Sequence, residues 1–188
     1  MNLFVPKRTS YEDQVSAGFC YLLNICDKSL GNLFLDKMSE LSGVERSILG
    51  DFVNCDFIGS KYISEKAISK PDIEIVTSTT SIYIENKIEA SADSIQLAKH
   101  LKSIPRKSYL MLLTKYVYKI DQAVLNTNSY IKPTSSDHFR WIDFDLAFSE
   151  SATTNFVEKK LLSDFKATLH SEGIKGRSYN CGVFSQVG

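Results

Sequence analysis

The chain has 188 residues, of which 43% are hydrophobic and 23% charged, and its formal net charge is +0. This length predicts one domain with a sizeable core, and the ordinary composition argues against a disordered chain. No apolar run approaches the roughly 18 residues of a membrane span, and the N-terminus "MNLFVPKRTSYED" lacks the features of a signal peptide. We therefore expect a cytoplasmic protein.

The cysteines are scattered as Cys20, Cys26, Cys55 and Cys181, with no C-x-x-C pair and no histidine at metal-ligand spacing. This pattern favours neither a disulfide framework nor a zinc site. We expect buried or idle thiols.

Two helices are expected first. Apolar residues recur at three- and four-residue spacing from 9 to 27, and a second helical stretch runs from 30 to 41, where Gly43 would end it. The segment 52–63 is rich in aromatic and β-branched residues and predicts a strand with an irregularity at Gly59.

Two alternating runs around "TSTT" then predict a β-hairpin. A helix capped by Ser91 or Asp93 follows, and the almost wholly apolar 108–114 predicts a strand buried on both faces. The segment 139–144 is expected to be a strand. A last helix is defined by Val157, Leu161, Phe165 and Leu169.

This order of elements predicts an α/β fold with a mixed sheet flanked by helices and an antiparallel hairpin at its centre. The domain is expected to span 1–172. Residues 173–188 contain four glycines without periodicity and are expected to form a tail or linker.

The hairpin has a register that can be derived from its numbering. If the turn is centred between Ser78 and Thr79, paired residues have numbers that sum to about 157, which places Asp72 opposite Glu85. Two carboxylates about 5 Å apart across a ladder repel each other. A cation between them would remove this repulsion.

A divalent cation suits this position, because Mg²⁺ is held by one or two carboxylates, waters and phosphate oxygens. Lys87 lies about 6.5 Å beyond Glu85 on the same face, where it can orient a water or stabilise developing charge. In isolation the motif is explained as well by an exposed Glu85–Lys87 ion pair and by Asp72 starting a strand after Pro71. The helix that follows, with Gln96, and a basic segment after it favour the metal site.

The sequence "PD", then "IENKIEA" and "QLAKHLKSI", resembles the PD-(D/E)XK nuclease superfamily, in the bacterial group with an "IENK…QL" pattern. Pro71-Asp72 resembles the PD element and Glu85-Asn86-Lys87 the (D/E)XK element. The motif core covers about a quarter of the chain, and the expected element order extends the resemblance over most of 9–145. The fold that this implies is a restriction-endonuclease-like αβββαβ core.

The resemblance also implies roles for individual residues. Asp72, Glu85 and the backbone carbonyl of Asn86 would hold Mg²⁺ or Mn²⁺, Lys87 would be catalytic, and Gln96 would position the lysine, the water or the phosphate. Glu12 on the first helix would be a further metal-site and catalytic residue, with Asp13 as the alternative. Glu12 is equally explained as part of a capping box with Thr9.

The expected activity is hydrolysis of DNA by a metal-activated water. No acid occurs from 94 to 120, and Lys99, Lys102, Arg106 and Lys107 within that segment are expected to hold the nucleic-acid backbone. By resemblance, such domains serve as effector nucleases in bacterial restriction or anti-phage defence, and as oligomers or parts of larger assemblies. Two alternatives remain open: an RNA-cleaving enzyme with the same site, and an inactive binding or interaction module.

Other candidates for chemistry are weaker. His100, His138 and His170 are far apart in sequence and are expected to be surface or packing residues. Trp141 is expected in the core. No phosphate-binding loop of the G-x-x-x-x-G-K-[ST] type occurs.

Overall fold

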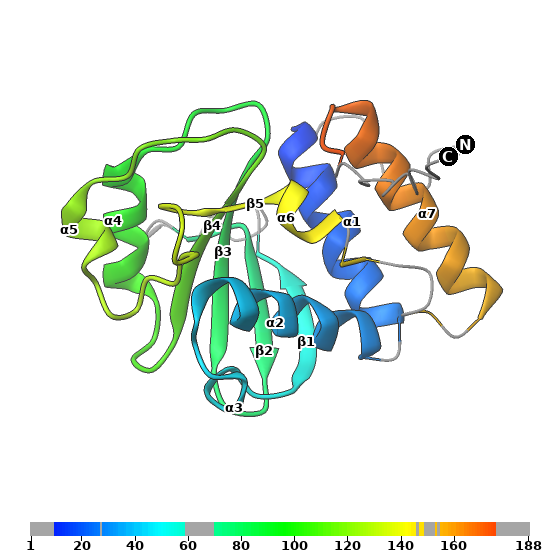
Figure 1. The fold of residues 1–188 in the computed structure, drawn as a ribbon, viewed down its shortest axis with the longest axis horizontal. Helices are drawn as coiled ribbons and strands as arrows, with labels where there is room; N and C mark the ends of the chain where they lie inside the picture. Colours follow the sequence, from blue (N-terminus) through cyan, green and yellow to red (C-terminus); the bar gives the residue numbers. More distant parts are fainter. Residues whose placement is uncertain are drawn as a thin grey trace, which may run out of the picture.

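The computed structural model describes residues 10–26, 28–58, 70–145, 147–148, 153 and 155–175. These form a mixed α/β fold in which a five-stranded sheet carries helices on both faces (Figure 1). In chain order the elements are α1 (Tyr11–Ile25), α2 (Ser29–Ser42), α3 (Arg46–Leu49), β1 (Phe52–Phe57), β2 (Ile73–Thr77), β3 (Ser81–Lys87), α4 (Ser94–Ser103), β4 (Tyr109–Thr114), α5 (Gln122–Leu125), β5 (Phe139–Arg140), α6 (Trp141–Asp145) and α7 (Phe156–Ser171). The prediction of an α/β class with a mixed sheet is confirmed.

The strands lie in the sheet in their sequence order, β1-β2-β3-β4-β5. The pairs β1–β2 and β2–β3 are antiparallel, whereas β3–β4 and β4–β5 are parallel. Because α4 connects the parallel strands β3 and β4, it crosses one face of the sheet and returns the chain to the end of the sheet where β3 began. The C-terminal ends of β3 and β4 therefore lie side by side.

The hairpin register is confirmed. The β2–β3 pairs run from Ile73 with Ile84 to Val76 with Ser81, and the residue numbers of each pair sum to 157. The N–H of Asp72 donates to the Ile84 carbonyl at 3.0 Å, so Asp72 is hydrogen-bonded to β3 at the residue before Glu85. The turn is closed by Thr77, whose N–H donates to the Thr80 carbonyl at 2.9 Å.

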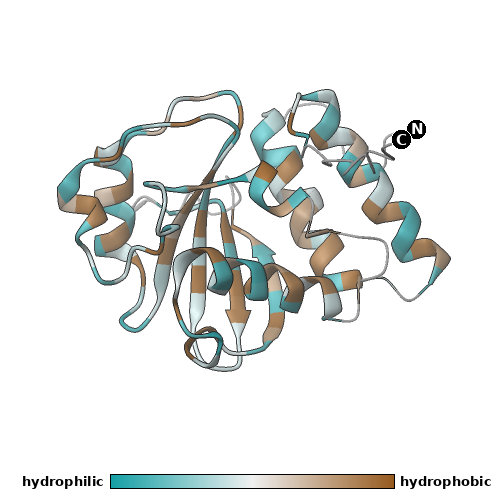
Figure 2. Ribbon diagram, viewed as in Figure 1, coloured by the Kyte–Doolittle hydropathy of each residue, from teal (hydrophilic) through white to brown (hydrophobic). Residues whose placement is uncertain are grey.

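Two hydrophobic cores lie on the two faces of the sheet. The larger core packs side chains of α1, α2, α6 and α7 against one face, and the smaller one packs α4 and α5 against the other. Strand β4 contributes to both, because Met111 and Leu113 face the larger core while Leu110 and Leu112 face the smaller one. The expected strand with two buried faces is confirmed, and Figure 2 shows the apolar residues gathered along the central strands.

The predicted strand 139–144 is wrong after its second residue. Strand β5 ends at Arg140, and helix α6 follows at once. The Asp143 carboxylate accepts the Arg140 N–H at 2.8 Å and so caps the helix start, while Trp141, Phe144 and Phe148 are buried at helical spacing. A six-residue apolar-rich segment is too short for its sequence alone to distinguish the two periods.

The strand predicted for 52–63 is β1, which ends at Phe57. Gly59 and the rest of that prediction lie outside the described residues. Asp93, rather than Ser91, is the N-cap of α4. At the C-terminal end, Ile174 is 3% exposed and belongs to the larger core, so the packed chain continues past 173. Residues 176–188 of the predicted tail lie outside the described part.

Cys20, Cys26 and Cys55 are free and buried, as expected, and Cys181 lies outside the described residues. The Cys20 and Cys55 sulfurs are 2.9 Å apart between α1 and β1, and burial raises the pKa of the Cys55 thiol. Among the described helices, none combines the length and the apolar character needed to cross a membrane.

Two buried helical glycines differ in the space around them, which gives a test of the packing. A Cβ on Gly31 of α2 would lie 2.3 Å from the Phe52 ring of β1, whereas a Cβ on Gly18 of α1 would meet Phe165 at an ordinary 3.8 Å. We expect Gly31→Ala to lower the free energy of unfolding by about 1–3 kcal/mol through overpacking. Gly18→Ala, the matched control, should raise it by about 0.5–1 kcal/mol through helix propensity. Urea unfolding measures both; equal effects would contradict this packing of α2 on β1.

Candidate active site

The candidate site lies at the C-terminal ends of β3 and β4. Alternation along β3 turns Tyr83, Glu85 and Lys87 toward the face covered by α4, and Ile82, Ile84 and Asn86 toward the larger core. Asp72 enters from the start of β2, and its Oδ2 accepts the Asn86 N–H at 2.8 Å. The sequence-predicted residues Asp72, Glu85 and Lys87 are therefore brought together.

Glu85 is the buried centre of this group, with 1% of its surface exposed. Its Oε1 lies 2.7 Å from Lys87 Nζ and accepts a hydrogen bond of 2.7 Å from Gln96 Nε2. Its Oε2 lies 3.0 Å from Nε2 of His100, a fully buried residue of α4. A buried carboxylate needs such partners, because an unpaired one would carry a large desolvation cost.

The surroundings of Asp72 disfavour its charged form. Burial and the charge of Glu85 raise the pKa of Asp72 from 3.8 to about 7, although the Asn86 N–H and Lys87 act in the opposite direction. Burial opposes the charged form of Lys87, but Glu85, Asp72 and Glu12 outweigh it and raise the pKa of the ammonium. At neutral pH Lys87 is therefore a proton donor and a positive charge, while Asp72 is close to its titration midpoint.

Asn86, the middle residue of the motif, is buried on the opposite side of β3. Its amide nitrogen donates to Ser16 Oγ at 2.9 Å, and its Oδ1 accepts a 2.8 Å hydrogen bond from Trp141 Nε1. This side chain joins β3 to α1 and α6 and fixes the strand that carries Glu85 and Lys87. Trp141 is 0% exposed, so its predicted place in the core is confirmed.

The side chain of Glu12 reaches this end of the sheet, where it accepts hydrogen bonds from the backbone. Its Oε1 accepts N–H groups from Ile88, Glu89 and Ala90 at 2.8, 3.0 and 3.0 Å, which fixes the chain immediately after Lys87. These three hydrogen bonds occupy Oε1. The negative charge of Glu12 also contributes to the raised pKa values of Asp72 and Lys87.

The helix start around Glu12 is capped by a different residue. Ser10 is the N-cap of α1, and its hydroxyl accepts the Asp13 N–H at 3.1 Å. The structure therefore has Ser10 rather than Thr9 as the N-cap, and Glu12 Oε1 contacts the segment after β3. Thr9 itself lies outside the described residues.

A segment after β4, residues 115–119, forms the rim beside the site. The Lys115 N–H donates to the Lys87 carbonyl at 2.9 Å, and the Tyr118 hydroxyl donates to the Ala90 carbonyl at 3.2 Å. Buried His138 holds this rim, because its Nε2 accepts the Tyr118 N–H at 2.9 Å. An acceptor at Nε2 requires the neutral imidazole with its proton on Nδ1, which lies 3.1 Å from the Phe139 carbonyl. His138 is thus a packing residue, as expected.

The four basic residues predicted to bind nucleic acid lie along and beyond α4. Lys99 and Lys102 are exposed on this helix. Arg106 and Lys107 follow it at the other end of the sheet, where Thr80 Oγ1 donates to the Lys107 carbonyl at 2.5 Å. From Thr80 to Glu85 the strand spans roughly 17 Å. The structure therefore places Arg106 and Lys107 away from the carboxylates.

His100 is the site residue that sequence reasoning missed. It was expected at the surface or in packing, but its imidazole is 0% exposed and lies against Glu85. The available signal was its spacing, since Gln96 and His100 are one turn apart and share a helix face. Glu74, on the same face of β2 as Asp72, is hydrogen-bonded across the hairpin: its Oε1 accepts the hydroxyl of the opposite Tyr83 at 2.7 Å.

The side chains of the site can be compared with the ligands that a divalent cation needs. Among the described residues, no three His, Cys, Asp or Glu side chains converge as a metal centre by themselves. Mg²⁺ and Mn²⁺ do not require this, because one or two carboxylates with waters and phosphate oxygens suffice. Asp72 and Glu85 bring two carboxylates to one end of the sheet, and burial together with the charge of Glu85 raises the pKa of Asp72. Asp72 and Glu85 fit a cation of this kind; Glu12 Oε1 does not, because three N–H groups occupy it.

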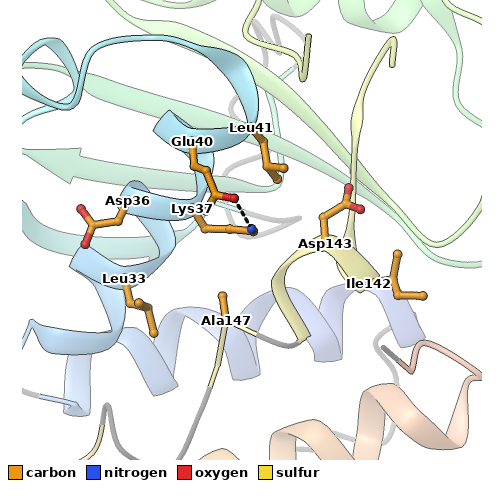
Figure 3. Close-up of a pocket in the computed structure, with 8 residues that line it drawn as sticks. All are labelled: Leu33, Asp36, Lys37, Glu40, Leu41, Ile142, Asp143 and Ala147. Carbon is orange, nitrogen blue, oxygen red and sulfur yellow. Dashed lines mark hydrogen bonds and ion pairs between the residues drawn. The ribbon is translucent and has the colours of Figure 1, made fainter. Parts of the chain in front are cut away.

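A second surface feature is the groove of about 530 Å³ between α2 and α6 (Figure 3). Its acids are already paired: Glu40 with Lys37 at 2.8 Å, Asp36 with Arg46 at 2.5 Å and Asp143 with Arg140 at 3.3 Å. With its charges neutralised by its own neighbours, this groove holds no group poised for chemistry.

Comparisons of the chain with protein-family models, with curated proteins and with solved structures return no match. The interpretation of this site therefore depends on its own geometry.

The contact of Glu12 with the backbone predicts a structural effect. Glu12→Ala removes three charge-assisted hydrogen bonds, so we expect a loss of about 2–3 kcal/mol of stability and at least tenfold faster hydrogen exchange at the amides of 88–90. Asp13→Ala, the neighbouring control, should cost only about 0.3–1 kcal/mol through the helix dipole and leave those amides protected. Unchanged exchange in Glu12→Ala would show that the carboxylate does not hold this segment.

The raised pKa of Asp72 predicts a pH-dependent stability of the metal-free protein. Between about pH 4 and pH 7 the unfolded chain releases a proton that folded Asp72, with its pKa of about 7, retains. Stability is therefore highest at the acidic end of this window and falls as the pH rises through it. Asp72→Asn removes this dependence, and we expect it to stabilise the protein by roughly 1–3 kcal/mol at pH 8 and hardly at all near pH 4.

Urea unfolding in EDTA at both pH values measures this effect of Asp72. Asp56→Asn, a change of the same chemistry at an exposed position of β1, is the control and should have little effect at either pH. If Asp72→Asn were no more stable than the wild type at pH 8, the repulsion between Asp72 and Glu85 would be refuted.

Proposed function

We propose that the protein is a metal-dependent nuclease that hydrolyses phosphodiester bonds of DNA, with a restriction-endonuclease-like core. The observation that carries the proposal is the buried Glu85 facing Asp72, with Lys87 and Gln96 on its Oε1. Like charges face each other there without a structural benefit, and a phosphate-binding cation explains them. In open α/β sheets, ligands bind outside the C-terminal ends of adjacent parallel strands, which is where this site lies.

Asp72 and Glu85 would hold Mg²⁺ or Mn²⁺, with the Asn86 carbonyl as a further ligand. When bound, such an ion polarises the phosphate and makes hydroxide accessible near neutral pH. Lys87, protonated because its pKa is raised, donates to a phosphate oxygen and stabilises the negative charge that develops there. Gln96 orients Glu85 through the 2.7 Å hydrogen bond from its Nε2.

The strip of Lys99, Lys102, Arg106 and Lys107 would hold the nucleic-acid backbone. It starts on α4 beside the site and ends roughly 17 Å away at the hairpin turn, a length of about five nucleotide steps. Contacts of this kind go to phosphates, so binding should depend on salt and read few bases. Service as an effector domain in bacterial defence, alone or in an assembly, is part of the same proposal.

Plasmid cleavage tests the proposed activity. We expect cutting with Mg²⁺ or Mn²⁺, none with EDTA, and a loss of about 10²–10³-fold in kcat for Lys87→Ala, because a charge that stabilises the transition state is removed. Lys160→Ala is the matched control, since Lys160 is exposed on α7 and pairs with Asp164. Wild-type rates of cutting by Lys87→Ala would refute the mechanism.

The same assay separates the alternatives. Labelled RNA and DNA of one sequence are offered side by side under identical metal and salt conditions. Faster cutting of RNA would favour the ribonuclease, and binding of either nucleic acid without cutting by the wild type would favour an inactive binding module.

A further inference from the structure

The buried imidazole of His100 is an anomaly in the site. It is 0% exposed, and neither of its ring nitrogens has a hydrogen-bond partner among the described residues. Its Nε2 lies 3.0 Å from Glu85 Oε2, but the atoms are not aligned as a hydrogen bond, and Oε2 is without a partner in the described part as well. Unsatisfied buried polar groups are costly, and a pair of them in contact calls for an explanation.

Helix α4 approaches the two oxygens of Glu85 with two side chains. Gln96 donates to Oε1 at 2.7 Å, and His100, one turn later on the same face, contacts Oε2. Lys87 also lies on the Oε1 side, at 2.7 Å. Within the described residues, His100 is therefore the polar group that faces Oε2.

We propose that His100 is a positioning residue for Glu85: it holds Oε2 so that Oε1, the oxygen beside Lys87, faces the reaction site. The catalytic meaning of this role rests on the proposed nuclease function. The role itself is a property of the metal-free protein, because His100 and Glu85 are already in contact. Groups that orient a metal ligand typically contribute 10–100-fold to metal affinity or activity.

Three variants test the proposal. His100→Phe keeps the ring shape and removes the donor, whereas His100→Gln keeps a donor of sufficient length. His100→Asn, whose amide stops short of Oε2, replaces the phenylalanine if that variant does not fold. His170→Phe is the matched control, because His170 Nε2 contacts the carboxylate of Asp145, 2.9 Å away, and not a carboxylate of the site.

The first readout needs no metal. In crystal structures of the metal-free variants, we expect the Glu85 side chain to leave its wild-type rotamer in His100→Phe and to keep it in His100→Gln. The second readout is titration with Mn²⁺ alone by calorimetry, where His100→Phe should bind 10–100-fold more weakly and His100→Gln within about threefold of wild type. The third is kinetics, where kcat should fall by a similar factor while KM for DNA stays unchanged.

The outcomes distinguish this proposal from the proposed function. If the Glu85 rotamer and Mn²⁺ affinity of a folded His100→Phe or His100→Asn equal those of the wild type, the positioning role is refuted while the nuclease can stand. If pulsed EPR detects ¹⁴N coupling from His100 to bound Mn²⁺, His100 is a ligand and not a positioning residue. If the Glu85 rotamer changes as expected but the wild type neither binds Mn²⁺ nor cuts DNA, the nuclease proposal fails. The role of His100 in positioning Glu85 then stands as a structural one.

Discussion

The burial of one carboxylate, that of Glu85, is the constraint on which the rest of the site depends. At 1% exposure this group cannot be hydrated, so its charge has to be balanced by the protein. Lys87 supplies a positive charge, and Gln96 and His100 bring donors from α4. The positions of these residues follow from one topological fact: α4 connects parallel strands and therefore must pack on the face of β3 to which Glu85 points.

The opposite face of β3 explains why this arrangement is rigid. Successive side chains of a strand point to opposite sides, so Asn86 enters the larger core between Glu85 and Lys87. Its amide is hydrogen-bonded to Ser16 of α1 and Trp141 of α6, both buried. A polar group so deep in a core is stabilising only when its hydrogen bonds are made. Here these bonds fix the position of β3 relative to α1 and α6. Glu85 and Lys87 thus lie on a strand whose opposite face is hydrogen-bonded to α1 and α6.

Much of this could be predicted from the sequence, because hairpin pairing and side-chain alternation are local rules. Counting residues across the turn was sufficient to derive the register of β2 with β3, which brings Asp72 and Glu85 to the same end of the hairpin, and the apolar run of β4 indicated its two buried faces. What failed depended on contacts between distant segments. Helix α6 was predicted as a strand because the short apolar-rich segment 139–144 fits the period of a strand as well as that of a helix. The role of His100 was missed because its partner Glu85 lies fifteen positions earlier in the sequence, on a different element. The same reason hid the binding of Glu12 to the backbone after β3, which no periodicity reveals.

Charge balance links the metal-free structure to the chemistry proposed for it. Two carboxylates lie at the end of the hairpin, where the Lys87 ammonium contacts Glu85, and burial followed by the charge of Glu85 raises the pKa of Asp72 to about 7. Glu12 adds a third negative charge to the same neighbourhood, balanced by three backbone N–H groups. Release of the Asp72 proton and withdrawal of Lys87 from Glu85 Oε1 would uncover oxygens for a cation and direct the ammonium toward a phosphate. Gln96, Asn86 and the segment held by Glu12 are hydrogen-bonded within the protein and would remain in place during that exchange.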